Sequence, residues 1–175
     1  PNSWNDLFNY LSKVEKFPIN LILASGLAIS KDNSDKIYDR FRNRLIVPIH
    51  DMQGRVVAFG GRSLDGQEPK YLNSPESEIF EKGKMLFAFE KASSNIRKRD
   101  KAIIVEGYFD VISLHSKGIT NSVASLGTAL NKYQISQLCR CTDNKNIILN
   151  FDSDNAGILA TKRVIKEVES LSLHD

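Results

Sequence analysis

Two short stretches that favour β-strands, residues 102–105 and 146–151, are each followed by acidic side chains. The acids are Glu106, Asp110, Asp152 and Asp154. Carboxylates held close together repel one another unless they share a hard divalent cation such as Mg²⁺, which takes oxygen ligands and leaves positions open for phosphate or water. The pattern therefore indicates metal-assisted phosphoryl transfer.

Each acid has a structural alternative. A single Asp after a strand commonly caps the next helix, which is an alternative for Asp110 and Asp154 taken alone. Asp152 and Asp154 are two residues apart, so they project the same way from an extended chain. Glu106 follows four apolar residues at a buried strand end, where an unpaired carboxylate is costly. Together the four acids favour a metal site over coincident caps.

The elements around the acids alternate between strand and helix. The sequence predicts strands over 102–105, 122–124 and 146–151, and helices from Val111 to Gly118, over 131–140 and over 155–171. The fully apolar first strand is typical of a parallel sheet buried on both faces. These elements indicate an open α/β sheet with crossover helices, in which active groups lie at the carboxyl ends of the strands.

The first part of the chain has a different pattern. Helices are predicted from Asn2-Ser3 through Leu11 and from Pro18 to Gly26, followed by a polar loop over 30–39. Two apolar runs, 45–49 and 55–61, flank a turn at 51–54 and indicate a β-hairpin. Pro48 in the first run predicts an edge strand. Residues 62–84 are polar and punctuated by Pro and Gly, which indicates a functional loop.

Composition sets the class. The chain has 175 residues, 41% of them hydrophobic and 26% charged, which is typical of a globular protein. It has no apolar run long enough to span a bilayer, so we expect a soluble protein. Its two cysteines, Cys139 and Cys141, match neither a zinc framework nor a secreted disulfide pattern, and are expected to be partly buried at a helix end.

The net charge of +3 is unevenly distributed. Residues 40–101 carry thirteen basic and eight acidic side chains, whereas the flanking segments are each slightly acidic. The candidate contacts to nucleic acid or nucleotide in this stretch are Arg40, Arg42, Arg44, Arg62, Lys70, Tyr71, Asn73 and Lys82. Cations interleaved with aromatics suit a nucleic-acid backbone or a triphosphate. The alternative, a solvated basic face, applies most to Arg40 and Arg42.

These motifs together resemble the bacterial DnaG-type DNA primases, in particular their RNA polymerase core with a Toprim subdomain. The stretches 40–51, 54–62 and 69–76 resemble the basic motifs particular to that family. The stretches 105–110, 124–129 and 151–157 resemble Toprim motifs, which also occur in type IA topoisomerases, OLD-type nucleases and RecR-type repair proteins. The basic motifs single out primase.

The resemblance implies a fold and a division of the chain. The expected fold is α/β with an α+β N-terminal part: a Toprim-type open, mainly parallel sheet flanked by helices, preceded by a small mixed α/β basic subdomain. The expected parts are a helical segment over 1–39, a basic β-containing primase subdomain over 40–98, and a Toprim catalytic subdomain over 99–175, truncated at its C-terminal end.

The resemblance also implies an activity: synthesis of short RNA primers on single-stranded DNA from ribonucleoside triphosphates, with metal-dependent nucleotidyl transfer. By similarity, Glu106, Asp110, Asp152 and Asp154 would hold two or more Mg²⁺ or Mn²⁺ ions, and Glu106, Asp152 and Asp154 would be catalytic. The eight basic-stretch residues would line a groove for template and triphosphate. The enzyme would work at the bacterial replication fork, in the cytoplasm and nucleoid.

Further expectations concern partners. The core is expected to be monomeric, to bind an RNA primer–DNA hybrid and to bind no membrane. The family's zinc-binding module, its helicase-binding domain and its third acidic pair are expected to lie outside this stretch. Two alternatives stay open: a Toprim nuclease or topoisomerase, and a nucleic-acid-binding module whose acids are structural.

Overall fold

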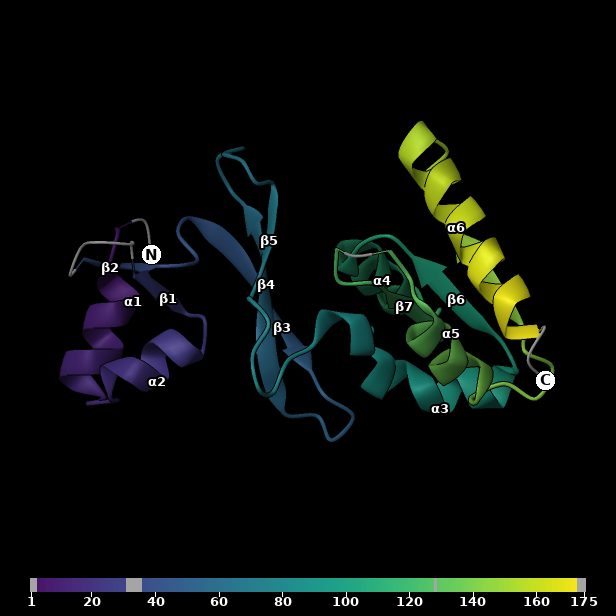
Figure 1. Ribbon diagram of the computed structural model, residues 1–175, viewed down its shortest axis with the longest axis horizontal. Helices are drawn as coiled ribbons and strands as arrows, with labels where there is room; N and C mark the ends of the chain where they lie inside the picture. Colours follow the sequence, from purple (N-terminus) through teal and green to yellow (C-terminus); the bar gives the residue numbers. More distant parts are fainter. Residues whose placement is uncertain (1–2, 31–35, 128, 173–175) are drawn as a thin grey trace. The chain divides into compact units, whose positions relative to one another are not determined.

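The computed structural model describes residues 3–30, 36–127 and 129–172. Its internal contacts divide the chain into two compact units, one of Pro1–Ile49 and Val56–Phe80, the other of His50–Arg55 and Glu81–Asp175 (Figure 1). The subdivision at residues 39 and 98 does not coincide with these contact units and stays a sequence-based prediction. None of the described helices is both long and apolar enough to cross a membrane.

The first unit begins with short helices. Its elements are α1 (Asp6–Asn9), a π-helical turn (Tyr10–Val14), α2 (Ile19–Ala24), β1 (Ala28–Ser30), β2 (Ile37–Asp39), β3 (Arg44–His50), β4 (Val56–Ser63) and β5 (Tyr71–Asn73). Both predicted helices are present. Gly26 follows α2 with φ of +69°, a left-handed conformation that suits glycine just past a helix end.

One predicted loop is partly wrong. Residues 31–35 of the predicted loop lie outside the described part, but residues 37–39 form β2, which pairs antiparallel with β1. The fully buried Asp39 ends this strand and accepts hydrogen bonds from the amides of Leu7 and Phe8, both at 2.8 Å. These amides at the start of α1 have no partner within the helix, so a distant acid supplies it. Sequence spacing could not reveal that pairing.

The predicted hairpin is confirmed as β3 and β4. β5 pairs antiparallel with β4, giving the sheet order β3-β4-β5, with β3 at an edge as Pro48 predicted. The stretch 62–84 is therefore not a simple loop, because it contains β5 and a 3₁₀ turn (Lys82–Lys84). A strand of three residues is too short for alternating hydrophobicity to reveal it.

The second unit is built around a parallel sheet. Its elements after the 3₁₀ turn are α3 (Phe89–Arg99), β6 (Ala102–Val105), α4 (Tyr108–Ser116), β7 (Ser122–Ala124), α5 (Lys132–Cys139), β8 (Ile147–Asn150) and α6 (Asn155–Ser172). The order is β7-β6-β8, and β6 runs parallel to both neighbours. The predicted strands and helices after residue 101 are all present, and the mixed α/β class is confirmed.

The core of this unit lies between the sheet and several helices. Ile104 of β6 and Val123 of β7 are fully buried with Ile96 of α3 and Leu138 of α5, and Val164 of α6 joins the same cluster. Cys139 is half-buried and Cys141 buried, both as free thiols, so the expectation for them is confirmed. The packed helices position the ends of β6 and β8, where the candidate acids lie.

Candidate active site and nucleic-acid interface

The acidic residues Glu106 and Asp152 lie at adjacent strand ends. In the parallel register Val105 pairs with Asn150 of β8, so the chain leaves both strands at the same edge of the sheet. The main-chain amide of Asp152 donates a hydrogen bond to Glu106 Oε1 at 2.9 Å. Both side chains are exposed. The predicted proximity of these two acids is therefore present.

Gly157 allows this arrangement. A Cβ added at this position would lie 2.0 Å from the Asp152 carbonyl oxygen and 2.8 Å from Glu106 Oε1. The first of these atoms belongs to the backbone and cannot move aside at small cost. The first turn of α6 therefore packs closely against the sheet edge that carries Glu106 and Asp152, here called the acidic edge. The space leaves no room for a side chain at position 157.

Asp154 and Asp110 make cap contacts. Asp154 Oδ1 accepts a hydrogen bond from the Gly157 amide at 2.8 Å, at the start of α6. Asp110 Oδ2 accepts from the Gly107 amide at 3.1 Å, at the start of α4. Each of these two acids therefore caps a helix, as the structural alternative predicted. A carboxylate that caps with one oxygen keeps a second oxygen for other chemistry.

The donor set suits a hard cation, although it is not a closed cage. Among the described residues, no group of three or more His, Cys, Asp or Glu side chains is arranged to hold a metal ion. Mg²⁺ commonly binds through one or two carboxylates and completes its shell with water and substrate phosphates. Exposed Glu106 and Asp152 fit that mode.

Arg62, Lys70 and Tyr71 form an exposed cation–aromatic cluster in the first unit. Arg62 and Tyr71 are directly opposite one another across β4 and β5. The Arg62 guanidinium carbon lies 6.0 Å from the centre of the Tyr71 ring, and Lys70 Nζ lies 5.7 Å from it. All three side chains are exposed. An aromatic ring between two cations can stack on a base while the cations contact phosphates.

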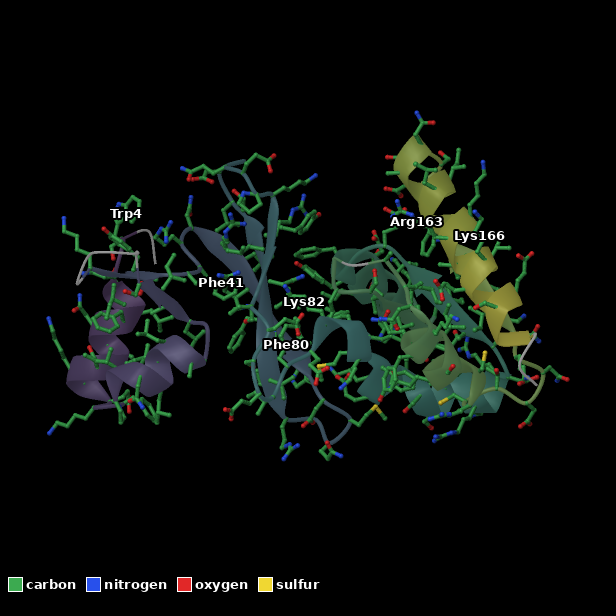
Figure 2. The ribbon with its side chains drawn as sticks, in the orientation of Figure 1. Trp4, Phe41, Phe80, Lys82, Arg163 and Lys166 are labelled. Atoms are coloured by element: carbon green, nitrogen blue, oxygen red, sulfur yellow. The ribbon has the colours of Figure 1, made fainter. Side chains whose placement is uncertain are left out.

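Arg40 and Arg42 have partners within the first unit. Arg40 Nε and Nη2 both donate to the main-chain carbonyl of Asn73, at 3.1 and 2.9 Å. Burial lowers the pKa of Arg40 from its usual value, although a guanidinium stays charged. Arg42 donates to the Asp39 carbonyl, and its guanidinium carbon lies 4.5 Å from the centre of the Trp4 ring. Trp4 is labelled in Figure 2. Both cations thus make contacts within the unit, and their predicted role in binding nucleic acid stays a prediction.

Arg44 and Lys82 complete the predicted set. Arg44 Nη1 lies 3.4 Å from the carbonyl oxygens of Gly61 and Lys70, so it bridges β4 and the start of β5. Lys82 belongs to the second unit, where it opens the 3₁₀ turn. The predicted basic residues are thus divided between the two units.

Two residues that contact the Lys82 turn, Asn131 and Gln134, are not among the predicted site residues. Asn131 and Gln134 form a capping box at the start of α5, and their side chains also bond the carbonyls of the Lys82 turn. The signal for the cap was present, since Asn followed three residues later by Gln marks a helix start. The contact to the turn lies 48 to 52 residues away in sequence and left no local signal.

Comparison with known families decides the assignment. Residues 1–93 match the family model described as "DNA primase catalytic core, N-terminal domain". The chain belongs to the DNA primase catalytic core family. Residues 103–175 match a second model, described as "Toprim-like", so both halves of the expected fold are present. The Toprim match implies divalent-metal chemistry in general terms.

Curated relatives named DNA primase share this primase core. One from Synechococcus elongatus is 54% identical over 172 residues, and one from Halalkalibacterium halodurans is 46% identical over 165 residues. These matches cover 98% and 93% of the chain, but 25% and 27% of the relatives. The chain therefore spans about a quarter of their length.

Solved primase structures share the fold. A DNA primase domain from Pseudomonas aeruginosa matches with a TM-score of 0.87 and 41% identity, over 96% of this chain and 51% of that one. A DnaG primase catalytic domain bound to single-stranded DNA matches with a TM-score of 0.81 and 38% identity, over 95% and 51%. The fold class expected from sequence is confirmed.

Proposed function

We propose that this chain carries catalytic residues of an enzyme that synthesises short RNA primers on single-stranded DNA. The observation that carries the proposal is the hydrogen bond from the Asp152 amide to Glu106 Oε1, which joins two acid-bearing strand ends in a primase core. Carboxylates carried by two adjacent strand ends at one edge of a sheet suit phosphoryl transfer on a triphosphate. The relative bound to single-stranded DNA supports a similar template for this chain.

Each acid has a proposed role. Glu106 and Asp152 would hold Mg²⁺ or Mn²⁺, with Asp110 and Asp154 contributing their second oxygens to two or more ions. When bound, such ions activate the attacking hydroxyl and neutralise charge on the triphosphate. The bond from the Asp152 amide orients the Glu106 carboxylate, which can then hold a cation or accept a proton without a large loss of side-chain entropy.

The proposed substrates and partners follow from the cations. Arg62, Lys70 and Tyr71 would bind the single-stranded template, and Lys82 would contact the ribonucleoside triphosphate. Arg44 and Asn73 would line the same surface as Arg62. The product is an RNA primer–DNA hybrid. We place the enzyme at the bacterial replication fork, with a replicative helicase as partner through another domain and with the core acting as a monomer.

Primer synthesis by the full-length protein tests the proposal. Incubation with single-stranded DNA, Mg²⁺ and labelled ribonucleotides should yield short RNA. Asp152→Asn and Glu106→Gln should lower the yield by about 100-fold or more while DNA affinity stays close to that of the wild type. Unchanged yield in both variants would contradict the proposal. Cleavage of the DNA with Mn²⁺, without RNA synthesis, would favour the nuclease alternative.

A further inference from the structure

The turn that carries Lys82 has local contacts between Lys84 and Glu81. The Lys84 amide donates to the Glu81 carbonyl at 3.0 Å, and Lys84 Nζ forms an ion pair with the Glu81 carboxylate at 2.8 Å. Both partners of this ion pair are more than half exposed, so it contributes little to stability. Other contacts must hold the turn.

Two side chains at the start of α5 supply these contacts. Gln134 Nε2 donates to the carbonyls of Lys82 and Met85, at 3.1 and 2.8 Å. Asn131 Nδ2 donates to the Gly83 carbonyl at 2.8 Å. The two side chains also bond each other's main-chain amides, at 3.1 and 3.2 Å. Three carbonyls of one short segment are therefore bound from one helix end.

The burial of Gln134 shows that these bonds are made away from water. Its exposed fraction is 0%, and both hydrogens of its amide group have carbonyl acceptors. A buried amide with all its partners rigidifies its surroundings, because breaking any bond leaves an unsatisfied polar group. The Asn131–Gln134 pair is therefore a clamp on the turn.

The clamped segment leads directly to the acidic edge. Five residues after Lys82, Phe87 pairs with Ala124 at the end of β7, through an amide-to-carbonyl bond of 2.8 Å. Ala124 is the register partner of Val105, which immediately precedes Glu106. Lys82 (Figure 2) thus lies on a segment fixed at one end to the carboxyl edge of the sheet and at the other to α5.

We propose that Asn131 and Gln134 are positioning residues that hold Lys82 in place for the phosphates of the incoming ribonucleotide. The inference rests on the proposed function, and it assigns the clamp a role in substrate binding beyond folding. A lysine has four rotatable side-chain bonds and much conformational freedom. Ordering this side chain on a nucleotide costs conformational entropy. A rigid main chain at residue 82 lowers that entropy cost, because the main chain is already ordered before the nucleotide binds.

Substitution of Asn131 separates the clamp from the helix cap. Asn131→Asp and Asn131→Ser both keep a cap acceptor for the Gln134 amide but lose the side-chain NH₂ group that reaches the Gly83 carbonyl, and the shorter serine hydroxyl is occupied at the cap. Each should raise KM for the ribonucleotide by about five- to tenfold in the full-length enzyme, with kcat changed much less. Because Ser is neutral, agreement between the two variants shows that the added charge of Asp is not the cause.

A double-mutant cycle with Lys82→Ala tests the link to Lys82. If the clamp acts through Lys82, Asn131→Ser should have almost no further effect on KM in the Lys82→Ala background. Multiplicative effects of the two substitutions, or an unchanged KM in Asn131→Ser, would overturn the proposal. Amide hydrogen exchange at residues 82–85 should also accelerate in Asn131→Ser, while α5 stays protected.

Asn144→Ser is the matched control for Asn131→Ser. It makes the same chemical change in an exposed loop ahead of β8, where the Asn144 amide group bonds the Asp100 carboxylate. This loop lies at the opposite, amino end of the sheet, so KM should not change. Asp152→Asn distinguishes the two proposals: if it abolishes primer synthesis while Asn131→Ser leaves KM unchanged, the clamp inference fails and the proposed function stands.

Discussion

Glu106 and Asp152, which are 46 residues apart in sequence, are joined by a hydrogen bond from the Asp152 amide to Glu106 Oε1 at 2.9 Å. The bond uses main chain on one side and a carboxylate on the other, so the Asp152 side chain keeps both of its oxygens for other partners. The parallel neighbours β6 and β8 end at the same edge of the sheet, so these residues lie side by side there. The position of α6 against that edge then sets how close the acids can be.

Gly157→Ala should disturb this edge. The new Cβ would meet the Asp152 carbonyl oxygen, so either α6 or the loop after β8 must shift. We expect a loss of about 1–3 kcal/mol in the free energy of unfolding, together with weaker Mn²⁺ binding. Chemical denaturation and calorimetric titration measure the two effects. Ala156→Ser, at the exposed preceding residue, is the control and should change neither; a fully stable Gly157→Ala would disprove the close packing.

Asp154 can be tested as a cap and as a metal ligand separately. Asp154→Asn keeps a cap acceptor for the Gly157 amide, so thermal stability should be close to that of the wild type. Asp154→Ala removes the cap and should cost about 1 kcal/mol. Both variants should bind Mn²⁺ more weakly, because each removes the carboxylate. Wild-type Mn²⁺ affinity in Asp154→Asn would show that this acid is a cap alone.

Arg62 and Arg40 should respond differently to the loss of their charge. Arg62→Gln should weaken binding of single-stranded DNA and lower the slope of log affinity against log salt by about one. Arg40→Gln should mainly lower the melting temperature, because it removes two bonds to the Asn73 carbonyl. Fluorescence anisotropy across a salt series and thermal unfolding measure these effects.

Arg55→Gln controls for the change in net charge in this comparison. Arg55 is exposed and pairs with Asp51, outside the predicted binding residues. Its removal should leave the salt slope nearly unchanged. Equal slopes in Arg62→Gln and the wild type would show that Arg62 does not contact phosphate.

Asp100 should make stability depend on acidic pH. Its carboxylate accepts hydrogen bonds from the Asn144 side chain and from the amides of Asn144 and Asp143, which lower the pKa of Asp100 from its usual value. A carboxyl with a lowered pKa stabilises the folded state above its unfolded pKa of about 4, and this contribution is lost as pH falls through the folded pKa. The urea concentration at half-unfolding should therefore decrease as the pH is lowered below about 4.

Asp100→Asn should flatten that dependence. The variant has no carboxyl to protonate at this position, so its urea midpoint should change less with pH below about pH 4 than that of the wild type. Identical pH profiles for the two proteins would show that Asp100 does not contribute. Glu78→Gln, which removes a carboxylate at another exposed position, is the control for the change in charge.

The local elements and the acidic residues at their ends could be predicted from the sequence alone. The apolar run 102–105 and the acid after it predicted a buried parallel strand with Glu106 at its tip, and Pro48 predicted an edge strand. Such features depend on burial periodicity and on backbone restrictions, which act over a few residues. For that reason they can be found without knowing which elements are neighbours.

Which of these residues lie close together, and which make contacts within the fold, depends on tertiary packing. Arg40 and Arg62 are the same residue type in one basic stretch, yet one bonds the half-buried Asn73 carbonyl and the other is exposed beside Tyr71. The clamp of Gln134 on Lys82 spans 52 residues. These roles depend on the packing of strands and helices that are distant in sequence, and no short-range pattern carries that information.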